Sequence, residues 1–288
     1  MENVDIFIIE KINELIQNNK KKQAYEMLKK YIDENVATKE VYLKIGEIAQ
    51  GLDILEAIHY YKEGVALYPD DNKLNIALGF LYFNNKEYYR AEKYLLKIWV
   101  EDPTNTRLLT TLGKIYKSFK QFEKAMKYFK LCELLEPANS FALYGIADTY
   151  RGIGDNNNAL QYWLKFNAIE PNNKLAITRI GDCYARLNEK ENALLFYRRA
   201  LEIDYDFFAH LGLAKIHLSN NEPKKALEIL ERIFQIEQKN SRYYCEYIDL
   251  CLAIGLKNKA LELYNMACNR FPDNAHLKSL ASKLFKNP

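Results

Sequence analysis

A period of 34 residues is the feature of this sequence that most constrains its fold. A small residue recurs at Gly79, Gly113, Ala147 and Gly181, and a tyrosine follows three residues later at Tyr82, Tyr116, Tyr150 and Tyr184. Nine residues after each tyrosine stands an alanine, and four residues beyond it a large apolar residue: Leu95, Phe129, Trp163 and Tyr197. Several columns that share one period indicate a solenoid, in which each repeat buries its apolar face by stacking on its neighbours.

Each repeat is expected to consist of two amphipathic helices, because apolar residues recur at helical spacing in 107–118 and again in 122–135. The turn between the helices carries a residue suited to the left-handed conformation at Gly154, Asn188, Asn221 and Gly255. A proline follows the second helix at Pro103, Pro137 and Pro171 and stops it there. No segment has the pattern of a strand, so the sequence predicts an all-α fold.

These columns resemble the tetratricopeptide repeat, whose pattern here includes Leu112-Gly113-x-x-Tyr116, Ala125-x-x-x-Phe129 and Pro137. The resemblance covers about residues 3–272. It implies a right-handed α-α superhelix of stacked antiparallel helix pairs with a C-terminal capping helix. We expect a single solenoid over 1–288, with a divergent first repeat at 3–37, repeats at about 39–71, 72–105, 106–139, 140–173, 174–206, 207–240 and 241–273, and a capping helix at 274–286.

The two ends carry apolar stripes that fit caps. At the front the stripe is Val4, Ile8, Ile9, Ile12, Leu15 and Ile16; at the back it is Leu277, Leu280, Ala281, Leu284 and Phe285. Ile6 and Phe7 fall off the front stripe. They either cover an edge of the first repeat or form a contact with a second copy of the chain.

No motif points to catalysis, and we predict no enzyme activity, no cofactor and no metal ion. His210 and His217 lie seven residues apart on one expected helix, so about 10 Å separates them, too far for one metal ion. Gly152-x-Gly154 lacks the Lys-Ser or Lys-Thr pair of a phosphate-binding loop.

The expected location is the cytoplasm. The five cysteines are odd in number and include no C-x-x-C pair, which is typical of reduced thiols. The first residues include Glu2 and Asp5 and so lack the basic start of a signal peptide. No apolar run reaches the roughly 18 residues of a membrane span. With 41 Lys and Arg against 38 Asp and Glu, the net charge of +3 does not predict binding to nucleic acid.

The resemblance also implies where a ligand binds, because the first helix of each repeat lines the concave groove in this family. Carried onto this sequence, the groove positions include Phe80, Phe83, Arg107, Lys114, Lys117, Tyr144, Asp148, Arg151, Arg179, Asp182, Arg186 and Lys215, with Phe208 and Arg242 in the later repeats. In the repeats that begin at 106, 140 and 174, six of these side chains are cations and two are anions.

Two interpretations of these charges stay open. They are either solvated and paired along a helix, as Asp148 and Arg151 could be, or they bind an acidic peptide through charge-assisted hydrogen bonds. The expected function is that of a scaffold or adaptor that binds a peptide or protein segment in the groove, with an acidic segment as the sharper hypothesis. The alternatives are a structural subunit or homo-oligomer that uses its convex or N-terminal surface, and an RNA-binding helical repeat.

Overall fold

The computed structural model describes the backbone of residues 2–285 and the side chains of residues 5–285. Within these residues the chain forms seventeen α-helices and no strand. It divides into two compact units, Met1–Thr149 and Tyr150–Pro288, with the boundary inside one helix. Whether the repeats form one continuous solenoid over 1–288 stays a prediction, and each unit is described by itself.

Unit 1 contains α1 (Glu2–Gln17), α2 (Lys21–Glu34), α3 (Lys39–Ala49), α4 (Ile54–Leu67), α5 (Asn72–Asn84), α6 (Tyr88–Glu101), α7 (Thr106–Ser118), α8 (Phe122–Leu135) and most of α9 (Ser140–Ile153). Unit 2 begins with the last residues of α9. It further contains the complete helices α10 (Asn156–Ile169), α11 (Lys174–Arg186), α12 (Lys190–Ile203), α13 (Phe207–Ser219), α14 (Pro223–Glu237), α15 (Ser241–Ala253), α16 (Lys257–Arg270) and α17 (Ala275–Leu284).

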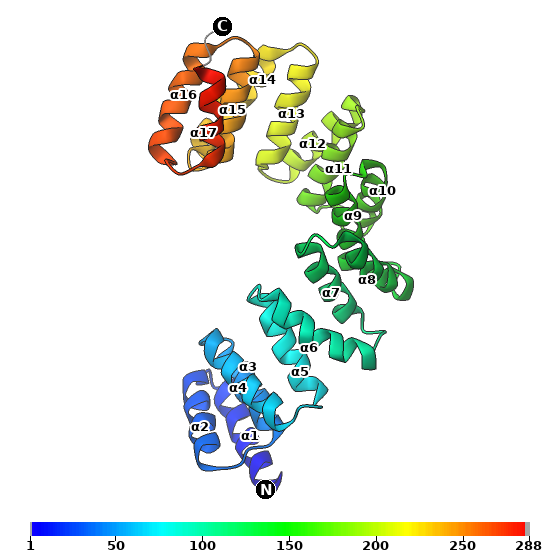
Figure 1. The fold of residues 1–288 in the computed structure, drawn as a ribbon, viewed down its shortest axis with the longest axis vertical. Coiled ribbons are helices and arrows are strands. Elements are labelled where there is room, and N and C mark those ends of the chain that lie inside the picture. Colours follow the sequence, from blue (N-terminus) through cyan, green and yellow to red (C-terminus); the bar gives the residue numbers. More distant parts are fainter. Residues whose placement is uncertain (1, 286–288) are drawn as a thin grey trace. The chain divides into compact units, whose positions relative to one another are not determined.

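Successive helices pack as pairs in both units. The pairs α3 and α4, α5 and α6, and α7 and α8 lie side by side in unit 1, as do α11 and α12, α13 and α14, and α15 and α16 in unit 2 (Figure 1). The prediction of an all-α fold of stacked helix pairs is confirmed.

The turns inside the pairs use the predicted left-handed residues. Gly154, Asn188, Asn221 and Gly255 have φ of +91°, +63°, +59° and +79°. The residue that follows each of them donates its N–H to the carbonyl of the column tyrosine or its equivalent, as Glu189 does to Tyr184 at 2.9 Å. Lys86 and Lys120 take the same conformation, at +61° and +58°. Sequence composition did not mark these two lysines as turn residues.

The glycine column makes room for an aromatic ring of the second helix. In unit 1 the ring of Phe129 lies between Gly113 and Gly145, where an added Cβ would stand 2.6 Å and 2.4 Å from ring atoms. In unit 2 the ring of Tyr197 lies between Gly181 and Gly212, with corresponding distances of 2.7 Å and 2.3 Å. Each ring therefore inserts between the first helix of its own repeat and that of the next repeat.

The ends differ in part from the predicted caps. At the front Ile12 is buried, Ile6 and Phe7 are exposed, and the Val4 side chain lies outside the described residues. The buried carboxylate of Asp5 accepts hydrogen bonds from the Tyr31 hydroxyl and from the N–H of Thr38, the residue that precedes α3.

At the back, Leu277, Leu280 and Leu284 of α17 are buried as predicted. Phe285, assigned from the sequence to the same stripe, is 61% exposed, and this assignment was wrong. Phe285 directly follows the buried Leu284 and keeps a helical backbone, so its side chain points about 100° further around the helix, where its ring meets that of Tyr264 edge-on.

Candidate functional site

The groove residues predicted from the sequence gather in separate places, some in each unit. In unit 2, Arg151, Arg179, Asp182, Arg186 and Lys215 line one cavity. In unit 1, Phe80, Phe83, Arg107 and Lys114 line another. The remaining three also lie in unit 1, where Lys117 contacts both Asp148 and the ring of Tyr144.

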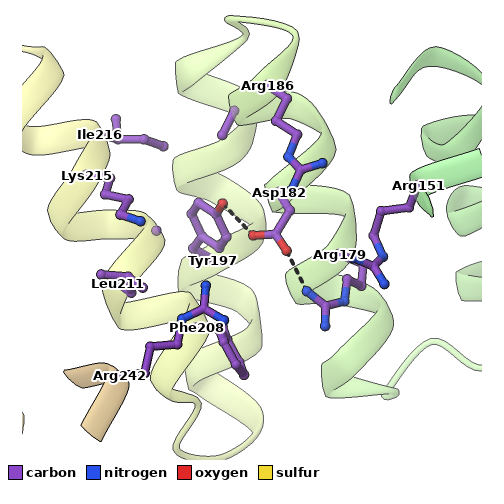
Figure 2. A pocket seen from close by; sticks show the side chains of 12 residues that line it. Arg151, Arg179, Asp182, Arg186, Tyr197, Phe208, Leu211, Lys215, Ile216 and Arg242 are labelled. Carbon is purple, nitrogen blue, oxygen red and sulfur yellow. Dashed lines mark hydrogen bonds and ion pairs between the residues drawn. The ribbon is translucent and has the colours of Figure 1, made fainter. Parts of the chain in front are cut away.

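We call the cavity of unit 2 the arginine pocket. It is an open cavity of about 340 Å³ between the first helices of successive repeats. Cationic side chains from α9, α11, α13 and α15 line it, and Figure 2 shows them extending toward the same space. The lining residues are Arg151, Arg179, Asp182, Ala185, Arg186, Tyr197, Phe208, Leu211, Gly212, Lys215, Ile216 and Arg242.

Asp182 is the one carboxylate among these lining residues, and both of its oxygens are engaged. Its Oδ1 accepts a hydrogen bond of 3.0 Å from the Tyr197 hydroxyl, and its Oδ2 lies 2.9 Å from Nη1 of Arg179 (Figure 2). Burial, and then the charge of Asp182, raise the pKa of Tyr197, so this hydroxyl stays a donor at neutral pH. Asp182 therefore holds Arg179 in place and leaves the surplus of positive charge in the pocket.

Two further cations of the arginine pocket share a partner that sequence reasoning missed. Lys215 Nζ lies 2.8 Å from Glu246 Oε2, and Arg242 Nε lies 3.7 Å from Glu246 Oε1. The guanidinium groups of Arg242 and Arg179 also lie 5.1 Å and 5.8 Å from the centre of the Phe208 ring. Glu246 lies on α15 four residues after Arg242, and this spacing could have predicted the contact between Arg242 and Glu246.

Arg186 has weaker protein contacts than Arg179, the other arginine of α11. Its guanidinium is exposed, and Nη1 lies 3.5 Å from Oδ1 of Asn156. Among the described residues no carboxylate forms an ion pair with it. Arg186 is therefore available to an anionic ligand at low cost, because binding breaks no ion pair.

We call the cavity of unit 1 the aromatic pocket. It has a volume of about 450 Å³ and is lined by residues of α5, α7 and the start of α9: Phe80, Phe83, Asn84, Thr106, Arg107, Thr110, Thr111, Lys114, Asn139 and Phe141. The Arg107 guanidinium lies 4.2 Å from the centre of the Phe80 ring, and Lys114 Nζ lies 4.9 Å from that of Phe141. Phe141 was missed, although it stands 34 residues after Arg107 and so in the same column.

The last three predicted residues support the interpretation of internally paired charges. Lys117 Nζ forms an ion pair with Asp148 Oδ2 and lies 5.9 Å from the centre of the Tyr144 ring. Both charged side chains are at least three-quarters buried. This cation is committed to its own chain, so we do not count it among those that face a ligand.

Neither the histidines nor the cysteines form a site in the described residues. No group of three or more His, Cys, Asp or Glu there could hold a metal ion. His217 Nδ1 lies 2.6 Å from Glu222 Oε2. Burial raises the pKa of Cys132, Cys183, Cys245 and Cys251 to about 11, so these thiols stay protonated and unreactive at neutral pH.

None of the helices in the described residues has the length and apolar character that a membrane crossing requires. The cytoplasmic location stays a prediction.

Comparison with known proteins gives the family of the repeats. The model of the tetratricopeptide repeat matches residues 106–139 and 176–207. No curated protein matches the chain.

Solved structures share its fold. A tetratricopeptide repeat protein from Parabacteroides merdae matches with a TM-score of 0.63 at 15% identity, over 86% of this chain and 98% of that chain. PilW, a type IV pilus biogenesis factor, matches with a TM-score of 0.64 at 18% identity, over 73% and 97%. MamA matches with a TM-score of 0.53 at 23% identity, over 55% and 94%. At these identities the likeness concerns the fold alone. Together with the packed helix pairs, it identifies the chain as a helical repeat protein, in which residues 106–139 and 176–207 match the tetratricopeptide repeat.

Proposed function

We propose that this protein is an interaction scaffold that binds an acidic segment of a partner protein in the arginine pocket. Repeats of this type generally bind protein partners and belong to families that are generally not catalytic. The observation that carries the proposal is the charge of the pocket: five cationic side chains line it against the single carboxylate of Asp182.

The way these charges are held suits an anionic ligand. Asp182, the single carboxylate among the lining residues, is already engaged by Tyr197 and Arg179. Glu246 is shared between two cations, one of them at 3.7 Å, and therefore neutralises at most one of them. Guanidinium groups bind carboxylates through two parallel hydrogen bonds, and such charge-assisted bonds are about twice as strong as neutral ones. A carboxylate of the partner would thus be bound by guanidinium groups of the pocket, above all by that of Arg186, which gives up no ion pair within the described residues.

The shape of the pocket favours a peptide side chain over a whole small molecule. The cavity is open to one side and lies along a row of first helices, so a chain segment can continue beyond it. Phe208 and Leu211 supply apolar area beside the cations. A segment with several acidic residues can therefore place one carboxylate in the pocket and pack its own backbone or methylene groups against Phe208.

The test uses a fluorescein-labelled peptide of twelve residues in which Glu and Ser alternate, with both ends blocked, and a matched peptide with Gln in place of Glu. Fluorescence anisotropy measures binding to the full chain. We expect the Glu peptide to bind and the Gln peptide not to bind. Replacing Arg151, Arg179 and Arg186 by Ala should weaken binding at least tenfold, which corresponds to the loss of about 1.4 kcal/mol.

The control removes the same charge elsewhere in unit 2. Arg198, Lys224 and Lys239 are exposed cations that do not line the arginine pocket. Replacing these three by Ala should change the dissociation constant less than twofold, and circular dichroism should show the same helicity for both triple variants. Equal weakening by the two triple variants would mean that only overall charge attracts the peptide, and the proposal would then be wrong.

If the wild-type chain binds neither peptide, the alternative of a structural subunit or homo-oligomer replaces the proposal. Its supporting observation is the exposure of Ile6 and Phe7 on α1, at 55% and 65%. The molar mass of the protein in solution then decides between a structural subunit and a homo-oligomer.

A further inference from the structure

The two cations of the aromatic pocket, Arg107 and Lys114, differ from Lys117, the third groove cation of unit 1, in having no anionic partner within the described residues. Among the described residues no carboxylate lies within ion-pair distance of Arg107 or Lys114. Lys117, only three residues after Lys114 on α7, has Asp148 as its partner. On α7, therefore, the groove cations without a carboxylate partner are the two that line the aromatic pocket.

Lys114 is also placed where an unpaired charge is costly. Its side chain is half-buried, and burial, followed by the charge of Lys117, lowers the pKa of its amino group. The ring of Phe141 is the group that stabilises this amino group. A bound carboxylate would neutralise the unpaired charge of Lys114, whose amino group is already partly desolvated.

The walls of the pocket require an apolar ligand group in addition to a charged one. Phe80, Phe83 and Phe141 contribute three rings, and Phe141 remains 63% exposed. The hydroxyls of Thr110 and Thr111 both donate to the Arg107 carbonyl, at 3.0 Å and 2.8 Å, and so offer no free donor to a ligand. The space between the two cations is thus suited to a large apolar side chain.

The spacing of the cations limits the ligand further. Arg107 and Lys114 are seven residues apart on α7, which corresponds to about 10 Å along the helix axis. A peptide in the extended polyproline II conformation advances about 3.1 Å per residue with three residues per turn, so side chains three residues apart lie on the same side at about 9 Å, close to this distance.

From these observations we infer that the aromatic pocket is a second binding site, which takes an extended internal segment of a partner protein with two acidic residues three positions apart and a large apolar residue between them. This site rests on the proposed scaffold function, but not on the arginine pocket. The apolar side chain lies among the phenylalanine rings, and the two carboxylates pair with Arg107 and Lys114.

The experiment measures fluorescence anisotropy with the peptide acetyl-Ser-Gly-Glu-Leu-Ser-Glu-Gly-Lys(fluorescein)-amide, which has no terminal carboxylate, and the full chain. We expect saturable binding that weakens at least fivefold when Leu is replaced by Ser, and at least fivefold when both Glu are replaced by Gln. The Arg107→Gln and Lys114→Met variants should each weaken binding at least fivefold, whereas Lys114→Arg should keep most of it.

The matched control is Lys124→Met. Lys124 lies on α8 of the same repeat with its amino group 5.2 Å from the centre of the Tyr116 ring, so it is also a cation on an aromatic face, but it does not line the pocket. This variant, and the Ala variant of the three arginines of the arginine pocket, should bind the peptide as the wild type does.

Three results would overturn the inference: no binding at millimolar protein, equal binding of the Leu and Ser peptides, or loss of binding in the arginine triple variant but not in Lys114→Met. The last result would keep the proposed scaffold function and place the peptide in the arginine pocket. Binding of the alternating Glu peptide without binding of the Leu peptide would likewise refute only the second site.

Discussion

Replacing Gly212 by Ala should destabilise unit 2 and disturb the arginine pocket together. An added Cβ at Gly212 would stand 2.3 Å from Cζ and 2.5 Å from Cε2 of Tyr197, whereas carbon atoms in contact are normally about 3.5–4.0 Å apart. The ring cannot retreat, because it is buried and Gly181 adjoins it on the other side. Either the ring or the helices must therefore move.

The expected magnitude follows from three contributions. Overpacking of this kind costs about 1–3 kcal/mol. Losing the hydrogen bond between the Tyr197 hydroxyl and the charged Asp182 costs about 1.5–3 kcal/mol if the ring is displaced. Alanine favours the helix over glycine by about 1 kcal/mol. We expect a net loss of about 2 kcal/mol in the free energy of unfolding of unit 2, although alanine is the better helix former.

The assay follows unit 2 by the fluorescence of Trp163, which is fully buried on α10. The chain has two tryptophans, so the variant Trp99→Phe leaves Trp163 as the only reporter. Urea unfolding in this background gives the free energy with and without Gly212→Ala. The same substitution in a Tyr197→Leu background should be neutral or stabilising by up to about 1 kcal/mol, because the ring is gone and helix propensity remains.

The reasoning is refuted if Gly212→Ala leaves the free energy of unfolding unchanged, or if it costs the same with Leu at 197. A displaced Tyr197 would also free one oxygen of Asp182, which would then compete with a ligand for the arginines. The Glu peptide should accordingly bind more weakly to Gly212→Ala even under conditions where the variant is folded.

Two further predictions concern unit 1. Burial raises the pKa of Tyr61 to about 12, so between pH 10 and 12 the folded state keeps a proton that the unfolded state has released. Tyr61 should therefore contribute a fall of up to about 2 kcal/mol in the free energy of unfolding over this range. Other tyrosines of unit 1 also have a raised pKa, so the fall in Tyr61→Phe should be smaller by that amount but not absent, as urea unfolding at each pH would show. Lys120 has a φ of +58°, which costs a residue with a Cβ about 1 kcal/mol. Lys120→Gly should consequently be at least as stable as the wild type in thermal unfolding, whereas Lys120→Val should lose more than 1 kcal/mol.

The partners of individual charges show the limit of sequence reasoning about the groove. The sequence predicted that Arg179, Asp182 and Arg186 lie on one exposed face of a helix. It did not show that Tyr197, assigned to a core column, would reach Asp182 from α12. Nor did it show that Lys117 would pair with Asp148 from the next repeat. Contacts 15 and 31 residues apart depend on how neighbouring helices cross and on which rotamer each side chain takes.

The fold was open to prediction because its determinants are local and repeated. The 34-residue period, the helical spacing of apolar residues and the turn residues Gly154 and Asn188 each act within one repeat, and every further copy restates the same pattern. By itself the sequence thus determined a stack of helix pairs, and its resemblance to the tetratricopeptide repeat implied the first helices as the candidate binding surface. Only the tertiary structure decided that most candidate residues line two pockets of different chemistry: Asp182 holds Arg179 in the arginine pocket, whereas Arg107 and Lys114 meet aromatic rings and, within the described residues, no carboxylate. The physical reason is that the net charge and polarity of a pocket are sums over side chains from several repeats, which only the packing of those repeats brings within a few ångströms of one another.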